Sequence, residues 1–259
     1  MQGPNPLVVV ASILRSLATV RNPNPEGSGH ADGAELASIL CAVETGGPRA
    51  LAASAAHLDA LIASMATLDP DGFDRNGSLA YWLDLYNAGA LALAARAAAS
   101  GEASVLRVPG AFSAPFVTVA GERLSLDAVE HAKVRRFADP RIHAALVCGS
   151  VSCPTLRPTP YSGTELAATL TDQMRSFLLR GGLEVSAQGD VVRLSKVFSW
   201  YGSDFVRPRR MPTFLPASGR RVLASLRPWI DADTLGVLDR SAPKVDYQSY
   251  DWGLRCTLG

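Results

Sequence analysis

Two cysteines five residues apart are the clearest chemical feature of the sequence. The stretch PRIHAALVCGSVSCP, residues 140–154, contains an apolar run, then Cys148, a turn of small residues, and Cys153 directly before a proline. The apolar run has the length of a buried strand, so we predict that Cys148 lies at the C-terminal edge of that strand. Gly149 and Ser150 allow a tight turn whose backbone N–H groups point outward. A thiol beside such donors could be the nucleophile of an acyl transfer, with the donors stabilising the oxyanion.

A carboxylate and two histidines are the candidates for a general acid or base. The segment LDAVEHAKVRRF predicts a helix capped by Ser125, with Glu130 on its apolar face. A buried carboxylate must be protonated or paired, so Glu130 is either a working acid or base or the partner of an arginine. His131 lies on the adjoining flank, about 100° from Glu130 at the helical period, and is the candidate base for Cys148. His143 precedes Cys148 by an odd number of residues, which in a regular strand places the two on opposite faces.

Two further polar residues lie in apolar surroundings. We predict a long helix from Ser78 to about residue 99, capped by Ser78, with Asn87 on its buried face. The amide of Asn87 either hydrogen-bonds a neighbouring loop and fixes the packing, or orients a catalytic side chain or the substrate. The aromatic segment KVFSWYGSDF predicts a helix that is core or pocket wall, with Tyr201 and Asp204 on opposite sides of one turn. Substrate-binding or orienting candidates are therefore Asn87, Gly149, Ser150, Cys153 and Tyr201.

The remaining elements predict an α/β mixed (α+β) fold, a mainly helical single domain around a small sheet. Residues 1–31 form an N-terminal helix and linker, and residues 32–259 form the domain. The expected helices follow Asp32 and Pro48 and cover residues 164–179, 220–226 and 233–238. The expected strands are VLRV, two hairpins around AG and QGD, and a closing strand, KVDYQSYDW.

Composition and charge exclude several classes of protein. The chain has 259 residues and a formal net charge of +1, so it lacks the basic footprint of a nucleic-acid-binding protein. The local cluster of Arg207, Arg209 and Arg210 is interpreted as a solvated loop. The first apolar stretch is interrupted by Arg15 and Arg21 and lacks a basic region before it, which argues against a signal peptide or membrane span. We therefore expect a cytoplasmic protein.

The cysteine count argues against a disulfide scaffold or a zinc site. The cysteines stand at positions 41, 148, 153 and 256, too few and too widely spaced for such a scaffold. Cys41 is interpreted as a buried, inert thiol beside an apolar helix face. The cysteines and histidines match no local zinc motif, so we predict no metal and no cofactor.

Five blocks in this order, AYWLDLYNAGAL, LSLDAVEH, DPRIHAALVCGSVSCPTL, LSKVFSWYGSDF and YQSYDWGL, resemble the domain of unknown function 547 family. The resemblance runs from about Gly72 to Trp252 and implies a mixed α/β domain. By analogy it extends to papain-like or transglutaminase-like cysteine enzymes. It also implies that the polar positions of the family are occupied here by Asn87, Glu130, His131, His143, Cys148 and Cys153.

Three functions follow from these residues. The first is a cysteine-dependent hydrolase or acyl transferase, peptidase-like or amidase-like, with Cys148 as nucleophile, His131 or His143 as base, and a peptide-like or small-molecule substrate. The second is a thiol–disulfide redox module of Cys148 and Cys153. The third is a noncatalytic binding or scaffold domain. The first requires a histidine within hydrogen-bond reach of Cys148, and the second requires two sulfur atoms close together.

Overall fold

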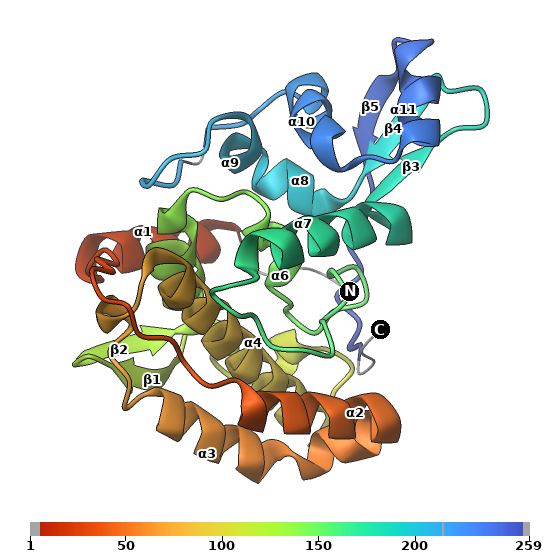
Figure 1. The fold of residues 1–259 in the computed structure, drawn as a ribbon. Helices are drawn as coiled ribbons and strands as arrows, with labels where there is room; N and C mark the ends of the chain where they lie inside the picture. Colours follow the sequence, from red (N-terminus) through yellow and green to blue (C-terminus); the bar gives the residue numbers. More distant parts are fainter. Residues whose placement is uncertain (1–5, 214, 256–259) are drawn as a thin grey trace.

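The computed structural model describes residues 6–213 and 215–255, and its centre is the long helix α4 (Arg75–Ala99) (Figure 1). Asp74 caps this helix, because its side chain accepts a hydrogen bond from the amide of Gly77 at 2.7 Å. The prediction that Ser78 caps the helix is wrong, since Asp74 starts it earlier and Ser78 is buried inside it. Asn87 faces the interior as predicted.

The N-terminal helices are α1 (Pro6–Thr19), α2 (Ala34–Ala53) and α3 (Ala55–Met65), and the last two pack on α4. Helix α2 kinks at Gly47, whose φ is 60°, directly before Pro48, the residue predicted to begin a separate helix. Cys41 is exposed, so the prediction of a buried thiol is wrong. The inward face of α2 consists of Leu36, Ile39, Leu40 and Val43. Cys41 follows Leu40 directly and therefore lies about 100° around the helix from it, away from this face.

A two-stranded hairpin follows α4 in the chain. Strands β1 (Pro115–Val119) and β2 (Glu122–Ser125) pair in antiparallel register, with Ala120 and Gly121 in the turn as predicted. The expected strand VLRV is instead the short 3₁₀ turn η2 (Val105–Arg107), which the side chain of Ser104 caps. A capping hydroxyl of this kind hydrogen-bonds the backbone locally and so competes with pairing in a sheet. The strand prediction considered only the apolar residues and not this serine.

The apolar run before Cys148 is helical where we predicted a strand. It forms α6 (Ile142–Ala145), and the chain becomes extended at Leu146. The side chain of Asp139 accepts a hydrogen bond from the amide of Arg141 at 3.0 Å, which starts the turn. A short apolar run cannot by itself distinguish a buried helix from a buried strand, and here the run packs against helix α7 (Leu166–Phe177).

The C-terminal third builds a second hydrophobic cluster, above α7 in Figure 1. Its sheet has the order β3–β4–β5, with β3 and β4 antiparallel as the predicted hairpin and β4 and β5 parallel. The predicted closing strand is shorter than expected, because pairing ends at Tyr247. These elements are β3 (Leu183–Val185), β4 (Val191–Leu194), α8 (Lys196–Trp200), α9 (Gly202–Val206), α10 (Gly219–Leu226), α11 (Ala232–Asp239) and β5 (Lys244–Tyr247).

The α+β fold class, mainly helical with small sheets, is confirmed. Helices α6 and α7 lie between the cluster around α4 and the cluster around β4 (Figure 1). No helix among the described residues combines the length and the apolar character that crossing a membrane requires. The segment after α6 therefore emerges where the two clusters meet, and this segment carries the two cysteines.

Candidate functional site

Asn87 holds the backbone that leads to Cys148. Its Nδ2 donates to the carbonyl of Ala145 at 3.0 Å, and its Oδ1 accepts from the amide of Val147 at 3.1 Å. Asn87 is buried, and these two bonds satisfy both ends of its amide. The contacts correspond to the first alternative considered for Asn87, a bond to a neighbouring loop, and that loop positions Cys148.

The turn after Cys148 is paired with the end of the described chain. Gly149 has a φ of 80°, a conformation that favours glycine. The amide of Val151 donates to the carbonyl of Gly253 at 2.9 Å, and the amide of Ser152 donates to the carbonyl of Asp251 at 3.3 Å. These amides therefore do not point outward as expected. The amide of Ser150 is directed at the Cys148 sulfur instead.

Three polar side-chain groups meet at Cys148, which is half-buried. Its Sγ lies 3.1 Å from Sγ of Cys153, 3.0 Å from Oγ of Ser150 and 3.3 Å from Oη of Tyr250. The hydroxyls of Ser150 and Tyr250 are 2.7 Å apart, so both lie on one side of the sulfur. Sequence reasoning missed Tyr250, although it belongs to the block YQSYDWGL.

These contacts separate the acidities of the two thiols. The hydrogen bond from Cys153, with further bonds from Ser150 and Tyr250, lowers the pKa of Cys148 to about 6 although burial opposes the shift. Burial and the neighbouring Cys148 raise the pKa of Cys153. Cys153 also accepts a hydrogen bond from the amide of Cys148 at 3.0 Å. Cys148 is therefore the reactive thiol of the pair.

Glu130 and His131 lie on a π-helical turn, η3 (Val129–Lys133), a geometry that often occurs at functional sites. Oη of Tyr201 donates to Oε1 of Glu130 at 2.5 Å. Burial raises the pKa of Glu130 to about 7, although the hydrogen bond from Tyr201 and the charge of Arg135 oppose this. A carboxyl group with this pKa can both donate and accept a proton near neutral pH.

The two histidines are bonded to other groups. Nε2 of His143 lies 2.9 Å from Oδ2 of Asp204, and its ring stacks on Tyr201 at a centroid distance of 4.0 Å. Tyr201 and Asp204 thus approach the same histidine, contrary to the prediction that they lie on opposite sides. Nδ1 of His131 lies 3.1 Å from Nη1 of Arg135, and burial and this cation lower the pKa of His131.

Arg135 is bonded to both Asp204 and His131. It donates from Nε and Nη2 to the two oxygens of Asp204, at 2.7 and 3.0 Å. Arg135 and Asp204 are residues to which sequence reasoning gave no role in the site. The sequence analysis considered an arginine as the partner of Glu130. Arg135 lies close enough for its charge to act on Glu130, but its hydrogen bonds go to Asp204 and His131.

Tyr86 lies near both Glu130 and the cysteines. It hydrogen-bonds Glu130, and it lies close enough to Cys148, Cys153 and Tyr201 for their charges to act on its hydroxyl. Burial, followed by these charges, raises the pKa of Tyr86. The sequence analysis treated Tyr86 only as part of the buried stripe of α4, because a tyrosine on such a stripe carries no separate signal.

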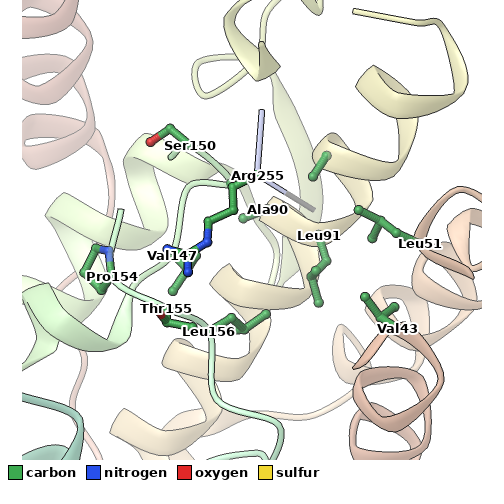
Figure 2. A pocket seen from close by; sticks show the side chains of 12 residues that line it. Val43, Leu51, Ala90, Leu91, Val147, Ser150, Pro154, Thr155, Leu156 and Arg255 are labelled. Carbon is green, nitrogen blue, oxygen red and sulfur yellow. The ribbon is translucent and has the colours of Figure 1, made fainter. Parts of the chain in front are cut away.

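Two cavities flank the cysteine turn. A small one of about 30 Å³ lies between the turn and α4, and Figure 2 shows Ala90 and Leu91 on its α4 side and Arg255 extending toward Val147. A larger one of about 280 Å³ is lined by Cys153, Arg180, Gln248 and Arg255. Cys153 therefore borders a space that a substrate could enter.

The described residues place the predicted candidates in two linked groups. Cys148, Gly149, Ser150 and Cys153 form the first, and Asn87 supports it. Glu130, His131, His143 and Tyr201 form the second. No hydrogen bond between either histidine and Cys148 is found in residues 6–213 and 215–255. In the same residues, no three His, Cys, Asp or Glu side chains are grouped to hold a metal ion. Cys256 lies outside the described residues.

Part of the chain matches the model of a known protein family. Residues 70–178 match the model of a protein family described as "Protein of unknown function, DUF547". Searches of curated proteins and of solved structures returned no match. The matched segment includes α4, the π-helical turn and both cysteines of the site. Over residues 70–178 the chain is therefore similar to the DUF547 family, the family that the sequence blocks resemble.

Proposed function

We propose that the protein carries out thiol–disulfide exchange, with Cys148 as the attacking thiol and Cys153 as the resolving thiol. The observation that carries this proposal is the 3.1 Å distance between their sulfur atoms. The lowered pKa of Cys148, about 6, makes it a thiolate at neutral pH, while the raised pKa of Cys153 keeps that group protonated until it is needed. The pair therefore supplies both the attacking thiol and the resolving thiol.

The reaction has two displacement steps. The Cys148 thiolate attacks one sulfur of a substrate disulfide, the substrate S–S bond breaks, and the departing thiolate takes a proton from solvent. Cys153 then loses its proton to solvent and attacks Sγ of Cys148, which releases the second substrate sulfur as a thiolate that is protonated in turn. The substrate disulfide gains two electrons and the protein dithiol loses two, and an external dithiol reverses the change.

An aromatic cluster beside Cys148 supports a polypeptide as the substrate. Tyr250, whose hydroxyl contacts Cys148, packs against Trp200 and Trp252 at centroid distances of 4.8 and 4.5 Å. Trp200 remains 45% exposed. Exposed aromatic rings provide apolar contact area for the side chains that flank a cystine in a peptide.

The test equilibrates the protein with reduced and oxidised glutathione and traps free thiols with iodoacetamide before peptide mass spectrometry. We expect one bridge between Cys148 and Cys153, and alkylation of reduced Cys148 with an apparent pKa of about 6. Cys148→Ser should abolish the bridge, whereas Cys41→Ser, which removes an exposed thiol, should leave it unchanged. Alkylation of Cys148 only near the ordinary thiol pKa of about 8.5, or no bridge in oxidising buffer, would contradict the proposal.

A cysteine-dependent hydrolase or acyl transferase is the second candidate, and the position of Glu130 near the cysteines favours it. The charges of Glu130 and Cys148 both raise the pKa of Tyr86, so the sulfur and a carboxyl group whose pKa is about 7 lie in the same buried region. In this candidate the role expected of His131 or His143 passes to Glu130. It requires an acyl group on Cys148 during turnover, which thiol exchange does not form.

A further inference from the structure

A third cavity, whose lining contains no cysteine among the described residues, is bordered by three arginines. It has a volume of about 130 Å³, and Arg75, Arg136 and Arg210 line it. No aspartate or glutamate is among its lining residues in the described part of the chain. The three arginines come from the start of α4, from the turn η4 (Val134–Phe137) and from the loop after α9. The folded chain thus gathers three positive charges around one hollow.

Arg136 is buried, and its guanidinium group is only partly hydrogen-bonded. Only 6% of the residue is exposed, and its Nη2 donates to the carbonyl of Leu17 at 3.1 Å. Its Nε is buried and has no hydrogen-bond partner among residues 6–213 and 215–255. A buried guanidinium normally has a carboxylate or several acceptors around it, because an uncompensated charge and an unbonded donor are both costly.

No carboxylate of the described residues compensates these charges. None of the three arginines forms an ion pair there, although other arginines of the chain, such as Arg135 and Arg141, do. The bond to Leu17 lies near the C-terminal end of α1, where carbonyl groups favour a cation, so Arg136 keeps its charge without having a counterion.

Arg75 and Arg210 complete the lining. Arg75 donates from Nη2 to the carbonyl of Phe137 and lies over its ring, with the guanidinium carbon 5.1 Å from the ring centroid. These contacts hold Arg75 beside Arg136. Arg210 is exposed and belongs to the basic cluster that we interpreted as a solvated loop. That interpretation describes the exposed Arg207 and Arg209, whereas Arg210 also borders the cavity.

We propose that this cavity is a binding site for a small oxyanion, with a phosphate or phosphate monoester as its preferred ligand. Three guanidinium groups match a dianion in charge, and each can present parallel N–H donors to phosphate oxygens. The bound oxyanion supplies the acceptors that Arg136 lacks. The same phosphate chemistry occurs in soluble phosphate monoesters and in phospholipid headgroups, and the site recognises the group that they share.

The test is isothermal titration calorimetry with inorganic phosphate at constant ionic strength. We expect saturable binding that Arg136→Gln weakens by about tenfold or more and Arg210→Gln by about three- to fivefold, because a buried charged donor contributes more than an exposed one. Arg193→Gln is the matched control, since Arg193 is an exposed arginine on β4 outside the cavity. It should bind phosphate as the unchanged protein does.

Two further arms complete the experiment. If Arg136→Gln does not fold, as judged by circular dichroism, Arg210→Gln decides the result, because the exposed Arg210 side chain forms no hydrogen bond or ion pair with the described part of the chain. Glycerol phosphate, and vesicles of phosphatidylcholine with and without phosphatidic acid, distinguish a soluble ligand from a headgroup. Absence of saturable phosphate binding, or equal affinity in Arg210→Gln and Arg193→Gln, overturns the proposal. Cys148 alkylation in Arg210→Gln should stay unchanged, so the two proposed sites are tested separately.

Discussion

The acidity of Cys148 depends on a few neighbouring donors rather than on a nearby cation. Cys153, Ser150 and Tyr250 each place a donor within 3.3 Å of its sulfur. Hydrogen bonds to a thiolate favour the charged form, which lowers the pKa. His131, by contrast, is held neutral by burial and by Arg135. Glu130 has a pKa of about 7 and is therefore the group whose part in the chemistry can be tested near neutral pH.

Replacing Glu130 with glutamine distinguishes the two candidate reactions. Exchange between Cys148 and Cys153 passes no proton through Glu130, so we expect Glu130→Gln to change the rate of disulfide formation by less than about threefold. An acyl transfer that uses Glu130 as acid or base would instead slow by about 100-fold or more. Disulfide formation, quenched by alkylation at set times, and p-nitrophenyl acetate hydrolysis measure the two activities. Glu184→Gln, on an exposed strand position, is the control.

A Cys148-dependent p-nitrophenyl acetate turnover that collapses in Glu130→Gln would favour the hydrolase.

The pH dependence of the free energy of unfolding tests the raised pKa of Glu130. Because its pKa is raised to about 7, its contribution to stability is present below the unfolded-state pKa of about 4.5 and is lost as the pH rises through about 7. Glutamine has no proton to lose, so this part of the pH dependence should disappear in the variant.

At the scale of elements, α4 supports the cysteine turn through one side chain. Asn87 bonds the backbone on both sides of Leu146, where α6 ends and the extended segment begins. The turn is held from its other side by backbone bonds to residues 251–255. The position of Cys148 is therefore fixed by a central helix and by a segment about 100 residues later in the chain.

Removing the amide of Asn87 should loosen the turn. In Asn87→Ala the carbonyl of Ala145 and the amide of Val147 lose their partners, and we expect the free energy of unfolding to fall by about 2–4 kcal/mol. Urea denaturation measures this change, and the apparent pKa of Cys148 alkylation should move toward that of a free thiol. Asn76→Ala, at an exposed position of the same helix, should change stability by less than about 0.5 kcal/mol. An Asn87 variant as stable as the Asn76 variant would show that the two bonds contribute little.

At the scale of the whole molecule, Asp204 joins the two hydrophobic clusters. It lies on α9 in the C-terminal cluster and bonds Arg135 and His143, which belong to the segments packed near α4. The hydrogen bonds from His143 and Arg135 lower its pKa although burial opposes them. A lowered pKa means that this stabilisation is present above the unfolded-state pKa of about 4 and is lost as the pH falls below it.

Asp204→Asn should therefore destabilise the protein most at neutral pH. The variant leaves Arg135 buried without its carboxylate, and we expect a loss of about 3 kcal/mol at pH 7. Because acid removes the same interaction from the unchanged protein, the difference should shrink between pH 4 and pH 2. Urea denaturation over this range measures it. Asp172→Asn, which breaks an exposed pair with Arg157, should cost less than about 1 kcal/mol, and an equal effect would contradict the role of Asp204.

The sequence by itself determined the elements with strong local signals. The hairpin at Ala120 and Gly121, the cap at Ser125 and the amphipathic helix α7 follow from turn residues, capping groups and apolar periodicity, which act over a few residues. The burial of Asn87 and Glu130 was predictable for the same reason, because each shares a helix face with apolar neighbours. The short apolar run before Cys148 was not, since its helical state depends on packing against α7.

Only the tertiary structure decided which polar groups meet. Tyr250 reaches Cys148 across about 100 residues of sequence and Asp204 reaches His143 across about 60, while Arg210 and Arg136, about 70 residues apart, line the same cavity. No local pattern records such contacts, because they arise from how two hydrophobic clusters pack and not from the preferences of any segment. The types of residue that could do chemistry were therefore visible in the sequence, whereas the partners that set their charge and reactivity came from the packing of the whole chain.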